Sequence, residues 1–402
     1  MRLFSFLVMP MTCNKTMLRI LGFLALLSVS ACSNNAINGS KKQQNTINST
    51  TALNLKSLQS IATITPQLAK SRVVFVGEQH TQYADHLNQL AVIKNLHKHW
   101  KQNISIGLEM VQQPYQSYLD DYVAGKISEQ KMLRGVQWYG RWRYDFRLYR
   151  PIFSYAKANK IPLVALNIPK ELTQRITKVG IKGLNKKERQ QLPALIDRSN
   201  KRYIKRITGV FGQHSHTSSK GIAKFLDAQL AWDEGMAFAA ANYLKKNSAK
   251  RMVIIAGGGH VINRSGIPDR LDRQINAKSA IVLNSVGETP SARQGDYLLF
   301  SPEIKLPAVG LMGILMGESP NGVIVESVVF HSAASKAGVQ KGDLILAIDG
   351  SAIKSPSDIR IWGIDKKPND KAKLKIKRKH KIIFKELTLK GKARANPHKL
   401  PK

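Results

Sequence analysis

Four acidic or imidazole side chains stand beside short apolar segments of this sequence: Glu78, His80, Glu109 and His260. Glu78 and His80 are two residues apart, and such positions on an extended chain point the same way. Carboxylates and imidazoles are ligands for Zn²⁺, Mn²⁺ or Fe²⁺. The same groups can act as general acid and base without a metal. The residue types therefore predict a pocket that is metal-binding or catalytic, and they leave both alternatives open.

The apolar segments are predicted strands, and helical patterns separate them. The predicted strands are residues 72–76, 104–108, 163–166, 252–256 and 280–286. The predicted helices are residues 83–100, 115–133, 148–160, 170–178, 186–197 and 222–245. Strands that alternate with helices indicate an α/β fold with a mainly parallel sheet and helices on both faces. We assign this domain to residues 55–301.

The polar residues fall where the predicted strands end. Glu78 and His80 follow the first strand, Glu109 the second, Asn167 the third, and His260 the fourth, after three glycines. Ligand sites in open parallel sheets form beyond the carboxyl ends of the strands. We therefore expect these side chains to converge on one pocket, although each residue alone could equally be a helix cap or a structural histidine.

The long predicted helix over residues 222–245 offers two more polar groups. Gln229 and Asp233 are four residues apart and so share one helix face. One interpretation is that they support the pocket through hydrogen bonds to Glu78, His80 or His260. The alternative is an ordinary amphipathic helix with one solvated face.

These motifs resemble the ChaN family of haem-binding lipoproteins, which belongs to a wider group with the Tiki metalloproteases and the erythromycin-esterase-like enzymes. The resemblance covers about residues 65–290. The motifs that carry it are Gly77-Glu78-Gln79-His80, Leu108-Glu109-Met110, Tyr149-Arg150-Pro151, the segment from Ala228-Gln229 through Asp233 to Met236-Ala237, and Gly257-Gly258-Gly259-His260-Val261.

The resemblance implies haem or iron uptake at the outer membrane. In the family, haem can sit between two subunits, with a tyrosine bound to iron and a histidine near the propionates, so a homodimer is expected. The ligand candidates here are Tyr149, Tyr203, His214 and His216. Tyrosine is a known ligand of haem iron. Tyr149 could equally be a core aromatic residue, and the His214/His216 segment could be plain linker.

A second, β-rich region is predicted over residues 305–392. It resembles a bacterial PDZ domain of the kind attached to envelope proteases, through the segments 322–329, 332–338 and 342–350. Its segment 373–377 alternates lysine with apolar residues, which is typical of a strand with one solvated face. The loop Val309 to Leu315 departs from the usual carboxylate-binding sequence of PDZ domains. A basic tail, residues 393–402, follows.

The beginning of the chain has the pattern of a lipoprotein leader over residues 1–31. Lys15 and Arg19 precede an apolar run that is too short to span a bilayer. The tetrapeptide Val29-Ser30-Ala31-Cys32 resembles a lipobox, so we expect lipidation at Cys32. The polar residues 32–54 cannot bury enough apolar surface to fold and are expected to form a flexible tether. By resemblance to other lipoproteins, Ser33 favours the outer membrane, with the protein facing the periplasm.

Composition narrows the possible partners. The sequence has two cysteines, Cys13 in the leader and the lipidated Cys32, which excludes disulfides and zinc–thiolate sites in the mature chain. The formal charge of +37 falls to +34 without the leader's Arg2, Lys15 and Arg19. In an envelope protein this charge favours anionic lipid, lipopolysaccharide or an anionic ligand, and we expect no nucleic-acid partner.

Three functions follow. The first is a membrane-anchored protein that binds haem or an iron compound without turnover. The second is a metal-dependent hydrolase of the Tiki and esterase-like group, in which a divalent metal or the Glu/His cluster activates water. The third is an envelope scaffold whose PDZ domain binds a peptide or protein by adding a strand to its sheet. The sequence does not decide whether the protein is an enzyme.

Overall fold

The computed structural model describes residues 53–212, 219–285 and 289–392. Cys32, most of the predicted tether, His214, His216 and the basic tail lie outside the described residues, so the predictions made for them stay predictions. Among the described helices, none combines the length and the apolar character needed to cross a membrane.

The first region is built on a six-stranded sheet in the order β3-β2-β4-β1-β5-β6, and its strands are all parallel. The predicted α/β class with a mainly parallel sheet is confirmed. The short edge strand β6 was not predicted. The strands are β1 (Val73–Glu78), β2 (Ile104–Gln112), β3 (Leu163–Asn167), β4 (Arg251–Gly257), β5 (Ser279–Asn284) and β6 (Tyr297–Leu299).

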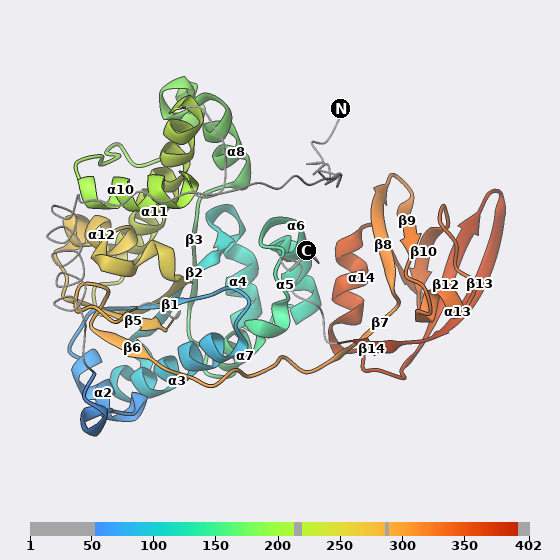
Figure 1. The fold of residues 1–402 in the computed structure, drawn as a ribbon, viewed down its shortest axis with the longest axis horizontal. Helices are drawn as coiled ribbons and strands as arrows, with labels where there is room; N and C mark the ends of the chain where they lie inside the picture. The colour runs from blue at the N-terminus through green and yellow to red at the C-terminus, as the bar shows by residue number, and fades with distance from the viewer. Residues whose placement is uncertain (1–52, 213–218, 286–288, 393–402) are drawn as a thin grey trace, which may run out of the picture. The chain divides into compact units, whose positions relative to one another are not determined.

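Helices cover both faces of the sheet (Figure 1). Alternate residues of β1, β3, β4 and β5 enter two separate cores, one on each face, whereas the apolar residues of β2 enter only the first. Val74 and Val76 of β1 face one core, and Val73 and Phe75 face the other. Strands buried on both sides read as continuous apolar runs, which explains why the sequence identified them. The helices over the first face are α2 (Ile61–Leu68), α3 (Tyr83–Trp100), α4 (Gln116–Val123), α5 (Glu129–Gly135), α6 (Trp138–Arg141) and α7 (Arg150–Ala158).

The second face is covered by the long helix α11 (Ser219–Lys246) and by α12 (Ile267–Ile275). Two further helices, α8 (Lys170–Val179) and α10 (Lys201–Gly212), pack against the first half of α11 through two small apolar clusters. The short helix α9 (Lys186–Arg189) lies between them in the chain. For α10, the sequence offered only a solvated helix face over residues 198–206 as one of two interpretations, and α12 was not predicted.

The neighbouring strands β1 and β4 send their connections to opposite faces of the sheet. β1 leads into α3 on the first face, whereas β4 leads into α12 on the second. Such a reversal opens a crevice beyond the carboxyl ends of the two strands, where ligands of open α/β sheets bind. The residues that follow β1 and β4 are therefore placed to form a site.

One predicted helix is shortened, and one predicted stretch is made of separate helices. The helical segments predicted over residues 115–133 are α4 and α5: Gly125, with a φ of +77°, follows the end of α4, and Ser128 then caps α5. The predicted helix 186–197 is reduced to α9. An Asn185/Glu188 capping box starts α9. Pro193 disfavours helical backbone in the residue before it, so the helix cannot extend.

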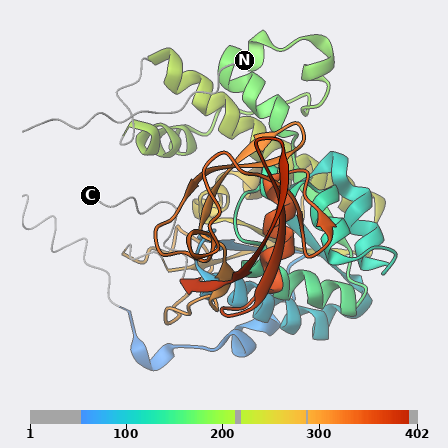
Figure 2. The same cartoon turned by 90° about the vertical axis from the view of Figure 1, so that its right-hand side faces the viewer.

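The second region is an antiparallel β-rich fold, whose strands face the viewer in Figure 2. Its main sheet has the order β13-β12-β10-β9-β8. Ala372, Leu374 and Ile376 of β12 are buried while the lysines between them are exposed, as the alternating pattern predicted. The elements are β7 (Val309–Leu311), β8 (Ile314–Ser319), β9 (Gly322–Val328), α13 (Ala333–Lys336), β10 (Leu344–Ile348), β11 (Ser351–Ala352), α14 (Pro356–Trp362), β12 (Lys371–Arg378), β13 (Lys381–Thr388) and β14 (Lys390–Lys392).

Candidate functional site

Glu78 and His80 form a hydrogen-bonded pair where β1 ends. His80 Nδ1 lies 2.6 Å from Glu78 Oε1, and the Glu78 side chain is fully buried. The His80 ring packs against Trp142 and Tyr144, with centroid distances of 4.7 and 4.9 Å, and its side chain keeps 27% exposure. Burial alone would lower the pKa of His80, but its interactions with Glu78 outweigh burial and raise that pKa. The pair therefore presents a basic imidazole that a carboxylate orients.

Glu109 lies inside β2, not after it as predicted from the sequence. The parallel pairing of β2 with β3 shifts register between Leu108 and Gln112, so the strand continues past Glu109 to Gln112. Glu109 Oε2 accepts a hydrogen bond from Gly257 N at 2.6 Å, which links β2 to the end of β4. Asn167 Nδ2 donates to the backbone oxygen of Glu109 at 2.9 Å, so Asn167 supports this irregular segment.

His260 lies between two carboxylates. Its Nε2 is 3.3 Å from Glu109 Oε1, and its Nδ1 is 2.5 Å from Asp233 Oδ1. Asp233 is buried on α11, and its Oδ2 accepts a 2.6 Å hydrogen bond from the Tyr203 hydroxyl of α10. The predicted hydrogen bond between Asp233 and His260 is thus present, and it joins β2, β4, α10 and α11.

The two carboxylates favour the charged form of His260. Burial alone would lower the pKa of His260, yet Glu109 and Asp233 raise that pKa well above its ordinary value. For Glu109, burial alone would raise the pKa, but the His260 charge and hydrogen bond lower it to about 2. His260 is therefore an imidazolium paired with carboxylates, whereas His80 is the imidazole with more access to solvent.

The structure brings the four predicted pocket residues together. A side chain added at Gly257 would place its Cβ 2.9 Å from His80 Cε1 and 3.6 Å from Glu109 Oε2. His80 and Glu109 thus approach the same glycine, and only glycine leaves room there. Among the described residues, no group of three or more His, Cys, Asp or Glu side chains is arranged to hold a metal ion.

The remaining predicted residues are placed differently. Among the described residues, Gln229 makes no hydrogen bond with Glu78, His80 or His260, so it lacks the predicted contact. Tyr149 is fully buried against His86 and Trp138, as expected for a core aromatic residue. Tyr203 is also buried, and its hydroxyl is bonded to Asp233. Burial raises the pKa of both tyrosines, which opposes formation of tyrosinate where they stand.

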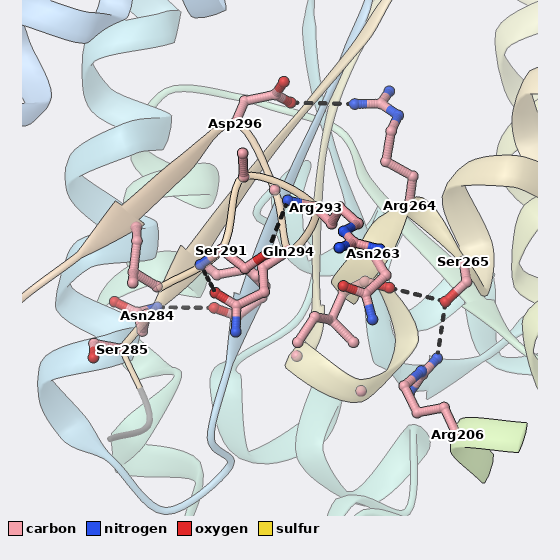
Figure 3. Close-up of a pocket in the computed structure, with 18 of the residues that line it drawn as sticks. Arg206, Asn263, Arg264, Ser265, Asn284, Ser285, Ser291, Arg293, Gln294 and Asp296 are labelled. Atoms are coloured by element: carbon pink, nitrogen blue, oxygen red, sulfur yellow. Dashed lines mark hydrogen bonds and ion pairs between the residues drawn. The ribbon is translucent and has the colours of Figure 1, made fainter. Parts of the chain in front are cut away.

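A cavity of about 1100 Å³ opens beyond the ends of β1, β4 and β5. Glu78 and Gln79 line it, together with the turn after β4 and the segment between β5 and β6 (Figure 3). Four arginines line it as well: Arg202, Arg206, Arg264 and Arg293. The predicted pocket therefore continues into a larger, basic cavity.

Sequence reasoning missed several residues of the site. Trp142 and Tyr144, which pack on His80, lie in an aromatic run from Trp138 to Tyr149, and this run is the sequence feature that indicates them. Asp85 of α3 accepts a 2.9 Å hydrogen bond from Gln79 N, and burial raises its pKa to about 6. Of the cavity arginines, Arg202 and Arg206 lie in the basic segment 198–206, which the sequence offered either as a contact for haem propionates or as a solvated helix face. Arg264 and Arg293 carried no signal in the sequence.

A groove lies between β8 and α14 of the second region, and the first region lines part of it. Residues 309–314 and 316 line a cavity of about 130 Å³ together with Ile359 and Trp362 of α14. Tyr139, Asp145 and Arg147 of the first region also line it. β8 is the last strand of its sheet, so its outer edge has no partner strand in that sheet. An unpaired edge is where an extended peptide can add a strand.

The His260 network generates a prediction about stability. Replacing Asp233 by Asn removes one carboxylate from a buried imidazolium, and breaking such a pair costs about 3–5 kcal/mol of unfolding free energy. A raised histidine pKa contributes stability that is complete below the ordinary value of 6.5 and is lost as pH rises through the folded-state pKa. The loss in Asp233→Asn should thus be largest near pH 6 and shrink at alkaline pH, as measured by urea unfolding.

The matched control is Asp121→Asn, because Asp121 pairs with Lys126 at an exposed position. Its unfolding free energy should stay within about 1 kcal/mol of wild type at every pH. Equal losses in both variants, or a loss in Asp233→Asn that does not depend on pH, would contradict the charged state of His260.

Comparisons with known proteins agree with this geometry. The model of the family described as "Haem-binding uptake, Tiki superfamily, ChaN" matches residues 64–271, and the PDZ domain model matches residues 310–389. Protein RETICULATA-RELATED 5, chloroplastic, of Arabidopsis thaliana is 25% identical over 266 residues, which are 58% of this chain. The chain spans about a third (35%) of that relative's length.

Two solved structures are among those that match part of the chain. ChaN of Campylobacter jejuni, described with cofacial haem binding, has 18% identity and a TM-score of 0.49, covering 58% of this chain and 89% of that one. The HtrA3 PDZ domain bound to a phage-derived ligand has 19% identity and a TM-score of 0.20, covering 21% of this chain and 88% of that one. Because the ChaN model matches more than half of the sequence, the chain belongs to the ChaN family of haem-binding uptake proteins, and a PDZ domain follows its ChaN domain.

Proposed function

We propose that this protein is a lipid-anchored protein of the bacterial outer membrane that binds haem in the periplasm and serves iron uptake. Membership of the ChaN family supports haem as the ligand. The observation that carries the proposal is the cavity of about 1100 Å³ at the crevice between β1 and β4. Pockets for small molecules and cofactors commonly have volumes of about 300–1,000 Å³, so this one can hold a tetrapyrrole.

The lining of the cavity suits a ligand with an apolar body and a polar edge. Ile262, Leu283 and Leu298 provide apolar surface, and arginine side chains provide positive charge. Tyr149 and Tyr203 do not line the cavity, so iron ligation by either tyrosine would require it to leave its buried position. The histidines His214 and His216 remain candidates from the sequence.

Haem binding in the cavity can be tested by obstructing it. Gly259 lines the cavity, and a Cβ added there would have no atom within 4 Å. Gly259→Leu should therefore fold normally but fill part of the cavity. We expect wild type to give a saturable Soret band on titration with haemin, and the variant to bind about ten-fold or more weakly, a loss of about 1.4 kcal/mol or more.

Gly140→Leu is the control for this experiment, because Gly140 also has open space at its Cβ position and lies outside the cavity. It should bind haemin as wild type does. The absence of a saturable Soret band for the wild-type protein would contradict the proposal that it binds haem. Equal affinity in Gly259→Leu would place the haem elsewhere.

The lipid anchor rests on the lipobox-like Val29-Ser30-Ala31-Cys32. Cys32→Ser removes the thiol to which diacylglycerol would be attached. We therefore expect the variant to lose labelling by radioactive palmitate. Because stable membrane anchoring takes more than one acyl chain or a second membrane signal, we also expect the variant to move from the washed membrane fraction to the soluble fraction. Ser33→Ala is the control and should stay labelled. Labelling of the Cys32→Ser protein at wild-type level would show that the anchor is elsewhere.

The PDZ domain supports a peptide or protein partner for the same chain. The unpartnered edge of β8 beside α14 is the surface to which an extended segment would add. In this proposal the PDZ domain places a haem-binding domain next to another envelope protein. The scaffold function thus accompanies haem binding instead of competing with it.

A hydrolase is the second candidate, and the Glu78–His80 pair favours it. A carboxylate that holds one imidazole nitrogen leaves the other free to accept a proton from water or a nucleophile. His80 can act as a base only when neutral, and its pKa is raised. A reaction that depends on it should therefore speed up as pH rises through that pKa.

His80→Gln should abolish any ester hydrolysis by the purified protein, assayed with a panel of fluorogenic acyl esters across pH. His97→Gln is the matched control, because His97 lies on α3 and is hydrogen-bonded to Tyr155 instead of the cluster. Wild-type rates no higher than those of His80→Gln for every ester would remove the hydrolase from consideration.

A further inference from the structure

The charges that line the large cavity do not balance. Four arginines line it, but Glu78 and Asp296 are its only acidic side chains among the described residues. Glu78 is paired with His80, and Asp296 forms an ion pair with Arg264, whose Nη1 donates a 3.2 Å hydrogen bond to Asp296 Oδ2 (Figure 3). Each carboxylate therefore already has a basic partner, although Oε2 of Glu78 is buried without a hydrogen bond. The other three arginines face the cavity without an acidic partner among the described residues.

Among these arginines, Arg206 of α10 gives the clearest indication of a binding site for an anion. Its guanidinium packs 5.4 Å from the centre of the Tyr203 ring, and Nη2 donates one hydrogen bond, of 3.2 Å, to Ser265 Oγ. Its Nε is buried without a hydrogen-bond partner, and the side chain forms no ion pair with any described residue. A charge removed from water is normally paired, so a partly buried guanidinium left in this state has an unmet demand for an anion.

Two further arginines line the same cavity and also lack an acidic partner among the described residues. Arg202 lies four residues before Arg206 on α10, which places both on one face of the helix. Arg293 comes from the loop between β5 and β6, and Ser291 and Gln294 hold that loop by two mutual hydrogen bonds (Figure 3). Neither Arg202 nor Arg293 forms an ion pair within the described part of the chain.

We propose that Arg206, together with Arg202 and Arg293, binds the propionate carboxylates of the haem, so that the cavity selects tetrapyrroles by their acidic edge. This inference rests on the proposed function. Guanidinium groups bind carboxylates through paired, charge-assisted hydrogen bonds. The tetrapyrrole body then lies towards Ile262, Leu283 and Leu298, while its carboxylates reach α10 and the loop that carries Arg293.

The test compares haemin with its dimethyl ester, which keeps the iron and ring but has no carboxylates. Arg206→Gln, and the double variant Arg202→Gln/Arg293→Gln, should each bind haemin about ten-fold or more weakly, since hydrogen bonds to charged groups contribute that much. Their affinity for the dimethyl ester should equal that of wild type. Arg175→Gln is the control, because Arg175 lies on α8, pairs with Glu188 and does not line the cavity.

Arg206→Gln also has a stability readout. Because Arg206 has no acidic partner, its replacement should not lower the Tm of the ligand-free protein, whereas loss of a structural ion pair would. Arg206→Lys keeps the charge without the fork of donors and should recover part of the haemin affinity. A lowered Tm together with unchanged haemin affinity would overturn the proposal in favour of a structural role.

The outcomes separate this inference from the function beneath it. If wild type and every variant bind haemin equally, the arginine site is wrong while haem binding stands. If wild type binds no haemin, the proposed function fails and the propionate assignment fails with it. Calorimetry with inorganic phosphate then identifies a small free anion as the ligand if phosphate binds wild type and not Arg206→Gln, and this too overturns the propionate assignment.

Discussion

A buried imidazolium between two carboxylates holds the functional end of this domain together. Glu109 of β2, His260 after β4 and Asp233 of α11 join the ends of two neighbouring strands to a helix that covers one face of the sheet. Each charge is costly to bury alone, so the arrangement is stable only when all three are present with the right geometry. The irregular end of β2, the glycine turn after β4 and the position of α11 all follow from this requirement.

The same constraint explains why Glu78 and His80 stand where they do. Glu109 also binds the backbone of Gly257, the last residue of β4, and β4 pairs in register with β1, placing Glu78 opposite Gly257. Fixing the His260 network therefore fixes the edge against which His80 packs. The two imidazoles have different environments: His260 is enclosed by carboxylates, while His80 has one carboxylate, two aromatic neighbours and access to solvent. A ligand or water can reach His80 more readily than His260.

The sheet and part of the site could be predicted from the sequence. Doubly buried parallel strands appear as apolar runs, and polar residues at their ends must converge, which located Glu78, His80 and His260. The prediction that Glu109 follows its strand was wrong, because a register shift inside a strand leaves no trace in hydrophobic periodicity. The arginines of the cavity were found only in part. The basic segment 198–206, which contains Arg202 and Arg206, had two interpretations, a contact for haem propionates and a solvated helix face, and the sequence could not decide between them. Arg264 could not be found this way, because it follows Asn263 in a turn where both residues have positive φ.

The Glu/His cluster has its charges paired internally, whereas the cavity has unpaired positive charge. Tyr203 contacts both. The cluster pairs its carboxylates with His80 and His260, so it needs no external charge. The cavity leaves Arg206 without an acidic partner, so it needs an external negative charge. Tyr203 donates its hydroxyl to Asp233 and offers its ring to Arg206, and an anion bound at Arg206 would lie close to this junction. Because Asp233 already serves both Tyr203 and His260, it is not free to neutralise Arg206, and the arginine remains available for a ligand.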